Sequence, residues 1–248
     1  MVHVKICGVT LPEHATAARE AGATFIGLIF AEQSRRRVTV EQAKRVVAAL
    51  PPRDEPPSVA LPLPAGHTGA LWFERCAAAL DGLATRRRPL VVGVFADQPA
   101  SLVNSIADAV PLDLVQLSGH EDWESCLLIR RPVLKTERVA AGADPGEVTA
   151  RAEAGTASML HLDTAVPGHL GGAGVTFDWQ IGRAIAARLP VLLAGGLTPD
   201  NVGVAIATVR PWGVDVSSGV ETEGLKDVAK IAAFVRAAQA ATLATESP

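Results

Sequence analysis

Two glycine-rich turns near the C-terminus carry the residue types that bind phosphate. The first turn follows the apolar run at 190–194 and contains Gly195 and Gly196. Glycine lets a backbone approach an anion closely, and the N–H groups that open a helix carry partial positive charge. Either turn alone could be a tight connection without a ligand. Because a second such turn ends the next predicted strand, the two together predict one phosphate site; the second turn contains Ser217, Ser218 and Gly219.

Four predicted strands alternate between apolar and polar residues with a period of two, which places the two kinds on opposite faces. The apolar face must meet helices, whereas the polar face is able to do chemistry. One polar residue on such a face could be a satisfied structural group, but the same polarity on four strands favours a site. The polar positions are Lys5 and Cys7, Gln116 and Ser118, His161 and Asp163, and Asp215 and Ser217.

The elements that position these residues alternate along the chain, a short apolar run followed by a helical pattern. Alternating strands and helices imply a parallel sheet, and eight such units are what a closed barrel needs. We therefore predict the α/β class and a single (β/α)8 TIM barrel domain over 1–248. In this fold, phosphate commonly binds at the loops after strands seven and eight. The predicted strands are 2–9, 25–31, 90–96, 114–118, 132–139, 159–164, 191–195 and 214–217.

Helix starts are marked by capping residues and prolines. Thr10 is expected to cap a helix that opens at Pro12, and Thr39 precedes another helical pattern. Pro99 and Pro199 stand before two further helices. Asp178 is interpreted as the cap of the helix beginning at Trp179, and not as a group that does chemistry.

One insertion, at about 52–88, breaks the rhythm between the second predicted helix and the third strand. Its first half is rich in proline and should be an irregular loop, and its second half has the pattern of one helix. A helix-to-strand connection lies at the N-terminal face of a barrel, away from the chemistry. Cys76 is therefore interpreted as core packing and Arg86, Arg87 and Arg88 as a solvated run. The expected apolar face is Leu71, Phe73, Ala77, Leu80 and Leu83.

Composition excludes several classes of function. The formal net charge of −3 gives no reason to expect binding to nucleic acid or to an anionic membrane. The three cysteines are far apart, and no metal-binding motif is present. The chain shows neither a signal-peptide pattern nor an apolar run of about 18 residues. We expect a cytoplasmic protein whose partner is a small molecule, and the sequence leaves its oligomeric state open between monomer and homodimer.

Eight segments in chain order together resemble the phosphoribosylanthranilate isomerase family of tryptophan biosynthesis. They are KICGVT at 5–10, GLIFAEQSRR at 27–36, VVGVFADQ at 91–98, VQLSG at 115–119, LDTA at 162–165, GGAGVTFDW at 171–179, LAGGLTPDNV at 193–202 and VDVSSGVE at 214–221. The match covers the chain except the insertion. The resemblance implies a (β/α)8 barrel, no cofactor, and an Amadori rearrangement of N-(5'-phosphoribosyl)anthranilate to 1-(2-carboxyphenylamino)-1-deoxyribulose 5-phosphate.

That reaction needs an acid to protonate the furanose ring oxygen and a base to remove the C2 proton. By resemblance, Cys7 is the base and Asp163 is the acid. A free cysteine has a pKa of about 8.5, so Lys5 on the same face is expected to help stabilise the thiolate. Asp163 needs a raised pKa, from burial or from nearby negative charge.

By the same resemblance, Arg36 matches the position that grips the anthranilate carboxylate, a task suited to a planar guanidinium. Arg35 and Arg37 are expected to be exposed. Asp215 is expected to bind a sugar hydroxyl, and Lys5 is placed in the substrate site. The loop 166–174, with Gly172 and Gly174, is expected to order over the substrate. The phosphate residues remain Gly195, Gly196, Ser217, Ser218 and Gly219.

The chain departs from the family at two positions, and two other functions stay open. Ser118 stands where many members have histidine, and Ala173 where a hydroxylated residue is usual. One alternative is an isomerase of a related phosphoribosyl amine, such as the histidine-pathway barrel. That relative looks as if it uses an aspartate on the first strand, where this chain has Cys7. The other is a barrel that binds a phosphate ligand without turnover. His161, His120 and His169 carry no motif and are interpreted as structural or surface groups.

Overall fold

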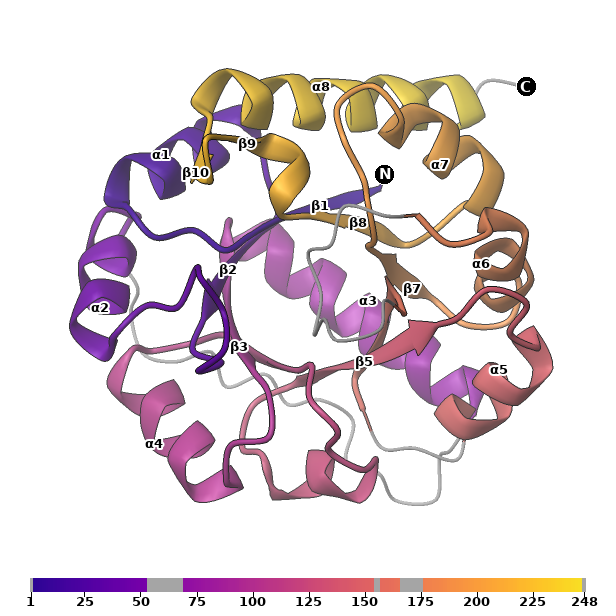
Figure 1. Cartoon of the computed structure of the whole chain (residues 1–248), viewed down its shortest axis with the longest axis horizontal. Helices are drawn as coiled ribbons and strands as arrows, with labels where there is room; N and C mark the ends of the chain where they lie inside the picture. The colour runs from indigo at the N-terminus through magenta and orange to yellow at the C-terminus, as the bar shows by residue number, and fades with distance from the viewer. Residues whose placement is uncertain (1, 53–68, 154–156, 166–175, 247–248) are drawn as a thin grey trace.

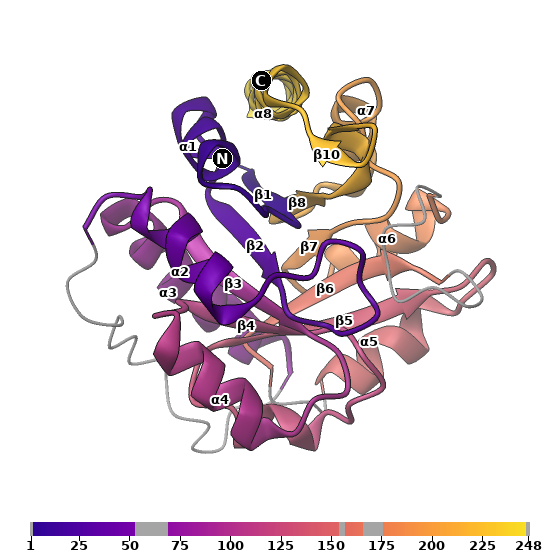
Figure 2. The same ribbon diagram turned by 60° about the vertical axis from the view of Figure 1, so that its left-hand side comes forward.

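Eight parallel strands close into a barrel in the order of the chain, and helices surround it (Figures 1 and 2). The computed structural model describes residues 2–52, 69–153, 157–165 and 176–246. The predicted TIM barrel is thereby confirmed, and the observed strands end within two residues of most predicted ends. The strands are β1 His3–Cys7, β2 Phe25–Ile29, β3 Leu90–Phe95, β4 Leu114–Leu117, β5 Val133–Val139, β6 Met159–Thr164, β7 Val191–Leu193 and β8 Gly213–Val216.

The outer ring differs from strict alternation in two places. Between β4 and β5 the chain forms only a short 3-10 helix, η1 Glu124–Leu128, and before β3 it adds an extra helix. A small hairpin of β9 Glu221–Thr222 and β10 Leu225–Lys226 follows the 3-10 turn η2 Ser218–Val220. The α-helices are α1 Pro12–Ala21, α2 Val40–Ala48, α3 Ala70–Arg86, α4 Ala100–Ala109, α5 Pro145–Glu153, α6 Trp179–Ala186, α7 Val202–Val209 and α8 Val228–Glu246.

The apolar strand positions form the core between barrel and helices. Ile6, Val115 and Leu162 are fully buried there, on the face that the alternation pattern assigned to the helices. Burying one such side chain contributes about 1.5–3 kcal/mol. Their neighbours in sequence therefore point into the barrel, and this orientation brings the polar side chains of several strands together.

Helix α3 lies across the N-terminal opening of the barrel, behind the ring of strands in Figure 1. Its Leu80, Leu83 and Ala84 pack against the first inward residues of the strands, including Phe25 and Leu90. The insertion thus lies at the end of the barrel that was predicted for it, although 53–68 falls outside the described residues. It closes this end of the barrel, which the sequence pattern did not reveal.

The details of α3 correct two expectations. Leu71 is 49% exposed, and Trp72 is buried in its place, donating from Nε1 to the carbonyl of Ala157 at 2.8 Å. Arg87 does not belong to a solvated run, because its Nε lies 3.1 Å from Oδ1 of the fully buried Asp113. Cys76 is buried, as predicted.

The predicted helix caps are confirmed in part. Thr39 forms a capping box with Gln42 at the start of α2, and Asp178 accepts from the backbone of Gln180 at the start of α6. Thr10 does not cap α1. That helix begins at Pro12 behind Leu11, without a side-chain cap, because proline supplies the helical backbone angle and has no N–H to satisfy.

Candidate active site

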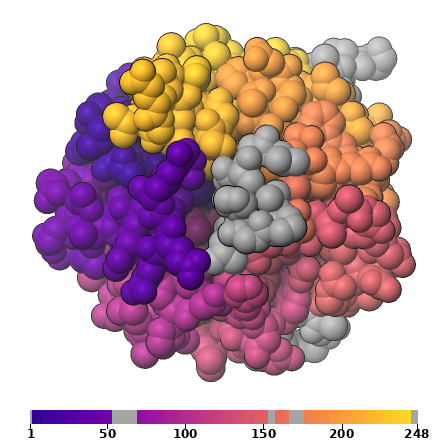
Figure 3. Space-filling model, viewed as in Figure 1, coloured from indigo at the N-terminus to yellow at the C-terminus, as the bar shows by residue number. Residues whose placement is uncertain are grey.

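A pocket of about 560 Å³ opens at the C-terminal end of the barrel. Figure 3 shows the hollow near the centre of this face, beside the purple segment that contains 31–36. Both glycine turns line the same pocket, as their positions on successive strands predicted. Of the described residues predicted for the site, only Lys5 does not line it. Those that do are Cys7, Arg36, Asp163, Gly195, Gly196, Asp215, Ser217, Ser218 and Gly219.

Cys7 lies at the end of β1 in a small apolar cluster with Ile29 and Val94. Gly27 on β2 makes room for the thiol, since a Cβ at that position would lie 2.8 Å from Sγ. Burial raises the pKa of Cys7, and Lys5 lowers it while Asp215 raises it further. The net direction is upward: Lys5 favours the thiolate, as expected, but burial outweighs its effect.

Lys5 forms an ion pair with Asp215. Its Nζ is fully buried and donates to Oδ2 of Asp215 at 2.7 Å. Lys5 and Asp215 are register partners on β1 and β8. Burial alone would raise the pKa of Asp215, but the charge of Lys5 and the hydrogen bond from His161 outweigh it and lower that pKa. The carboxylate therefore stays ionised beside the pocket.

Asp163 lies at the end of β6, at the same rim as Cys7. Its Oδ1 accepts from the backbone N–H of Thr164 at 2.8 Å. Burial raises the pKa of Asp163, although the nearby charges of His161 and Arg138 oppose this effect. The direction is the one that an acid working near neutrality needs.

A hydrogen-bonded chain of polar side chains runs around the inside of the barrel. Nε2–H of His161 donates to Oδ2 of Asp215 at 3.0 Å, and Nδ1 lies 3.0 Å from the hydroxyl of Thr136. The Thr136 hydroxyl lies 2.9 Å from that of Ser118, which accepts from Nε2 of Gln116 at 2.9 Å. His161 was interpreted from the sequence as a structural or a surface group. It is a structural group, and it also lines the pocket.

Two acceptor atoms of these hydrogen-bonded side chains are buried without a partner among the described residues. They are Oδ1 of Asp215 and Oε1 of Gln116. Both side chains line the pocket. An unsatisfied buried acceptor costs about 1–3 kcal/mol, which a hydroxyl of a bound molecule would recover. The site therefore offers acceptors to a ligand that carries several hydroxyl groups.

The two glycine turns approach each other closely. Gly195 and Gly196 adopt positive φ angles of 88° and 62°, which favour glycine. A Cβ at Gly219 would lie 1.9 Å from the carbonyl oxygen of Leu197. Within the described residues, the backbone N–H groups of Gly195, Gly196 and Ser218 donate to no backbone acceptor. Free N–H groups of this kind are suited to an anion.

Arg36 lies in the loop after β2 and is buried, whereas Arg35 and Arg37 are exposed, as predicted. Its Nε and Nη2 donate to the two carboxylate oxygens of Glu221 at 2.6 and 2.9 Å. Gly8 permits this position, because a Cβ there would lie 2.6 Å from Cδ of Arg36. The guanidinium lines the pocket with part of its donor set already in use.

Sequence reasoning missed Glu221 and Lys226, which are buried beside the pocket. Glu221 closes the VDVSSGVE segment but received no role, and Lys226 belongs to no motif. The hairpin that pairs them has a usable signal: Glu223 and Gly224 form its two-residue turn with φ angles of 52° and 83°. Such a turn predicts that the residues on either side face each other across the two short strands.

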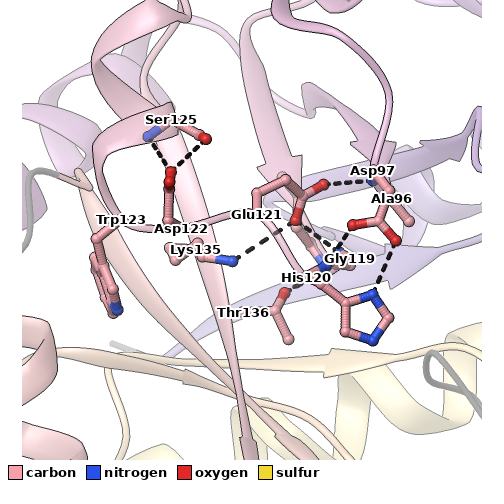
Figure 4. Close-up of polar contacts among 12 residues, drawn as sticks. Ala96, Asp97, Gly119, His120, Glu121, Asp122, Trp123, Ser125, Lys135 and Thr136 are labelled. Carbon is pink, nitrogen blue, oxygen red and sulfur yellow. Dashed lines mark hydrogen bonds and ion pairs between the residues drawn. The ribbon is translucent and has the colours of Figure 1, made fainter.

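Contacts between loops fix the rim beside β3 and β4 (Figure 4). Glu121 accepts from the backbone N–H groups of Asp97 and Gly119, both at 2.8 Å. His120 is exposed, and its Nδ1 lies 3.0 Å from Oδ2 of Asp97. This places His120 at the surface, in agreement with the interpretation from sequence. The contacts hold Ser118, which precedes this loop, at the pocket wall.

Several predicted features lie outside the described residues. Gly172, Gly174, Ala173 and His169 are among them, with the rest of the loop 166–174. In the part of the chain that is described, no helix is long and apolar enough to span a membrane. The same residues contain no group of three or more His, Cys, Asp or Glu side chains placed to hold a metal ion.

Comparison with known proteins gives a consistent family. A sequence model described as N-(5'phosphoribosyl)anthranilate (PRA) isomerase matches residues 74–237. A protein of Dehalococcoides mccartyi named N-(5'-phosphoribosyl)anthranilate isomerase is 39% identical over 240 residues, which cover 95% of this chain and 94% of that protein.

Solved structures agree with this result. The crystal structure of phosphoribosyl anthranilate isomerase from Thermotoga maritima superposes with a TM-score of 0.75 at 33% identity, covering 97% of this chain and all of that one. A second structure of such an isomerase, in complex with reduced 1-(o-carboxyphenylamino)-1-deoxyribulose 5-phosphate, has a TM-score of 0.72 at 32% identity, with the same coverage. The chain belongs to the phosphoribosylanthranilate isomerase family.

Proposed function

We propose that this chain isomerises N-(5'-phosphoribosyl)anthranilate to 1-(2-carboxyphenylamino)-1-deoxyribulose 5-phosphate, with Asp163 as the general acid and Cys7 as the general base. One observation carries the proposal: a thiol and a carboxyl group with a raised pKa line one pocket, which also contains two facing glycine turns. A relative has been solved with a reduced form of this product, a molecule that carries a phosphate, a sugar chain and an aromatic carboxylate.

In the first step, the protonated carboxyl of Asp163 gives its proton to the ring oxygen of the ribofuranose. The bond from C1 to that oxygen breaks, and the lone pair of the anthranilate nitrogen forms a C1=N double bond. A carboxyl group can act in this way near neutrality only if its pKa is raised, and burial supplies that change here.

In the second step, the thiolate of Cys7 removes the proton from C2 and leaves an enolamine. The C2 hydroxyl of the enolamine then loses its proton while C1 gains one, which gives the aminoketone. Cys7 and Asp163 come from β1 and β6, which are separated by two strands, β7 and β8, on one side of the barrel and by four on the other. The two groups can therefore act on a sugar held between them. Because the pKa of Cys7 is raised, the thiolate is a minor form near neutrality.

Binding is assigned to three groups of residues. The N–H groups of Gly195, Gly196, Ser218 and Gly219, with Ser217, hold the phosphate. The unpartnered Oδ1 of Asp215 accepts from a sugar hydroxyl, while its Oδ2 stays paired with Lys5. Arg36, next to the Ser217 turn, binds the aromatic carboxylate. The closing role of the loop 166–174 with Gly172 and Gly174 stays a prediction.

The direct test supplies N-(5'-phosphoribosyl)anthranilate to the purified chain and follows the loss of its fluorescence. The proposal expects turnover by the parent and a loss of kcat by about 10² or more in Cys7→Ser and in Asp163→Asn. Both variants should still bind a reduced product analogue with nearly the affinity of the parent. A parent that binds this analogue without turnover would instead support a non-catalytic ligand-binding barrel.

A further inference from the structure

A buried cluster of charges lies beside the pocket, between Arg36 and the second glycine turn. The side chain of Glu221 is 5% exposed and contacts three cations. Arg36 and Lys226 each approach its Oε1 at 2.6 Å, and the exposed Arg35 reaches its Oε2 at 3.0 Å. Three cations around one carboxylate leave a net positive charge at this wall of the pocket.

Glu221 fixes the orientation of Arg36. It occupies Nε and one proton of Nη2, which form one edge of the guanidinium. Within the described residues, Nη1 of Arg36 donates to no acceptor, so this nitrogen of the guanidinium is available to a ligand. A bidentate contact holds the guanidinium plane in one direction, which a single contact would not do.

Lys226 connects the same carboxylate to the phosphate turn. The side chain of Lys226 is 1% exposed, and its Nζ donates to the carbonyl of Ser217 at 2.9 Å. The hydroxyl of Ser217 in turn donates to the carbonyl of Cys7 at 3.2 Å. One short hairpin therefore contacts both Arg36 and the second glycine turn, which lie side by side next to Gly8, and it does so through two side chains that face each other across β9 and β10.

The charge on Glu221 is stable over the working pH range. Burial alone would raise its pKa, but the hydrogen bonds from Arg36 and Lys226 lower it to about 2. The Glu221 carboxylate therefore stays ionised near neutrality.

We propose that Glu221 and Lys226 are positioning residues that set the distance between carboxylate recognition at Arg36 and phosphate recognition at Ser217–Gly219. The inference rests on the proposed function, because it concerns a substrate with a phosphate at one end and an aromatic carboxylate at the other. Glu221 acts on the carboxylate end through Arg36, and Lys226 acts on both ends. Neither residue needs to touch the reacting atoms.

The test compares Glu221→Gln and Lys226→Met with the parent, using turnover and competition by inorganic phosphate. Glu221→Gln should raise KM about tenfold or more and change kcat by less than about threefold, because the substrate carboxylate is held equally in the ground and transition states. Its inhibition constant for inorganic phosphate should stay within about twofold. Lys226→Met should raise both KM and that inhibition constant.

A matched control and a second variant keep the test sharp. Lys230 donates to the backbone carbonyl of Glu221 at 2.8 Å from an exposed position, so Lys230→Met should leave both constants unchanged. If Glu221→Gln does not fold, Glu221→Asp keeps the charge but is too short to reach both nitrogens, and it should also raise KM.

A double-mutant cycle identifies the route of the effect. In an Arg36→Met background, Glu221→Gln should change KM by less than about twofold, since its action through Arg36 has already been removed. An unchanged KM in the single variants, or an equal rise in both backgrounds, would overturn the inference while leaving the proposed function in place. Absence of turnover by the parent would overturn both.

Discussion

Lys5 donates to Asp215 at 2.7 Å across the seam between the first and last strands of the barrel. The same lysine lies near Cys7 and lowers its pKa, whereas Asp215 raises it. The thiol thus lies beside an ion pair whose two members act on it in opposite directions. Because burial adds to the effect of Asp215, the thiol stays protonated near neutrality.

This relationship predicts opposite shifts in two variants. Lys5→Met removes the cation and should raise the pKa of Cys7, whereas Asp215→Asn removes the anion and should lower it. Both charges act within a buried site, where water screens them weakly, so both shifts should be large enough to measure. The measurement is the pH dependence of alkylation of Cys7 by iodoacetamide.

Cys7→Ser is the control for that measurement, because Cys76 and Cys126 are also buried thiols with pKa values raised to about 12. Label that remains in Cys7→Ser belongs to these two and is subtracted. Shifts of the same sign in Lys5→Met and Asp215→Asn would mean that the variants act through a change of structure and not through charge.

The pH profile of kcat/KM should show two breaks, one for the general acid and one for the general base. Here the acid, Asp163, has the lower pKa and the base, Cys7, has the higher one, which is the reverse of the usual order. The active form needs the Cys7 thiolate and the protonated Asp163 together. Since the pKa of Cys7 is raised from about 9, the thiol is the weaker acid, and the active fraction is constant between the two pKa values. The lower break then reports Asp163 and the upper break reports Cys7.

Arg138 tests this assignment. It is the register partner of Asp163 on β5, and its positive charge lowers the pKa of Asp163. Arg138→Met should therefore move the lower break to higher pH by about half a unit or more, while Arg138→Lys, which keeps the charge, should leave it in place. A lower break that is unmoved in Arg138→Met would assign it to another group.

Much of the barrel could be predicted from sequence because its signals are local. Alternation within β1, β4, β6 and β8 was enough to separate inward from outward residues, and the order of strands and helices was enough to predict closure. The contacts that set the chemistry are not local. Lys5 and Asp215 are 210 residues apart in the chain, and only the closed barrel makes them neighbours.

The errors have similar physical causes. A helical pattern fixes the period of an apolar face but leaves its phase open, so Leu71 was predicted to be buried where Trp72 is. Arg87 looked solvated because its partner, Asp113, lies in a connection between two later elements. The role of Glu221 depends on a hairpin whose turn signal was present but unused.

Gly27→Ala should lower kcat without changing phosphate binding. The added Cβ would lie 2.8 Å from Sγ of Cys7 and 3.1 Å from its Cα, so the thiol must move. A displaced base costs rate because proton transfer depends on its position, and we expect a loss of about tenfold or more in kcat. The inhibition constant of inorganic phosphate should not change, since the glycine turns lie on other strands.

Gly82→Ala is the matched control for Gly27→Ala. A Cβ at Gly82 would have only Nη1 of Arg86 near it, at 3.8 Å, and the residue lies inside α3. The substitution should stabilise the protein by up to about 1 kcal/mol, as alanine does in a helix, and leave kcat as it is. Equal losses of kcat in the two variants would remove the steric explanation.

Leu80→Ala in α3 should lower stability and spare catalysis. Leu80 is fully buried where the helix closes the N-terminal opening, so its truncation should reduce the free energy of unfolding by about 2–5 kcal/mol. Between this helix and the pocket lies a layer of inward apolar side chains that includes Val92, Leu134 and Met159, followed by the polar layer that contains His161. Two packed layers separate Leu80 from the reacting groups, so kcat and KM should stay within about twofold at a temperature where the variant is folded.

Denaturant unfolding and steady-state kinetics measure the two effects, with the exposed Leu71→Ala as the control that should change stability by less than about 0.5 kcal/mol. A folded Leu80→Ala variant with a large loss of kcat would show that α3 influences the site through those two layers.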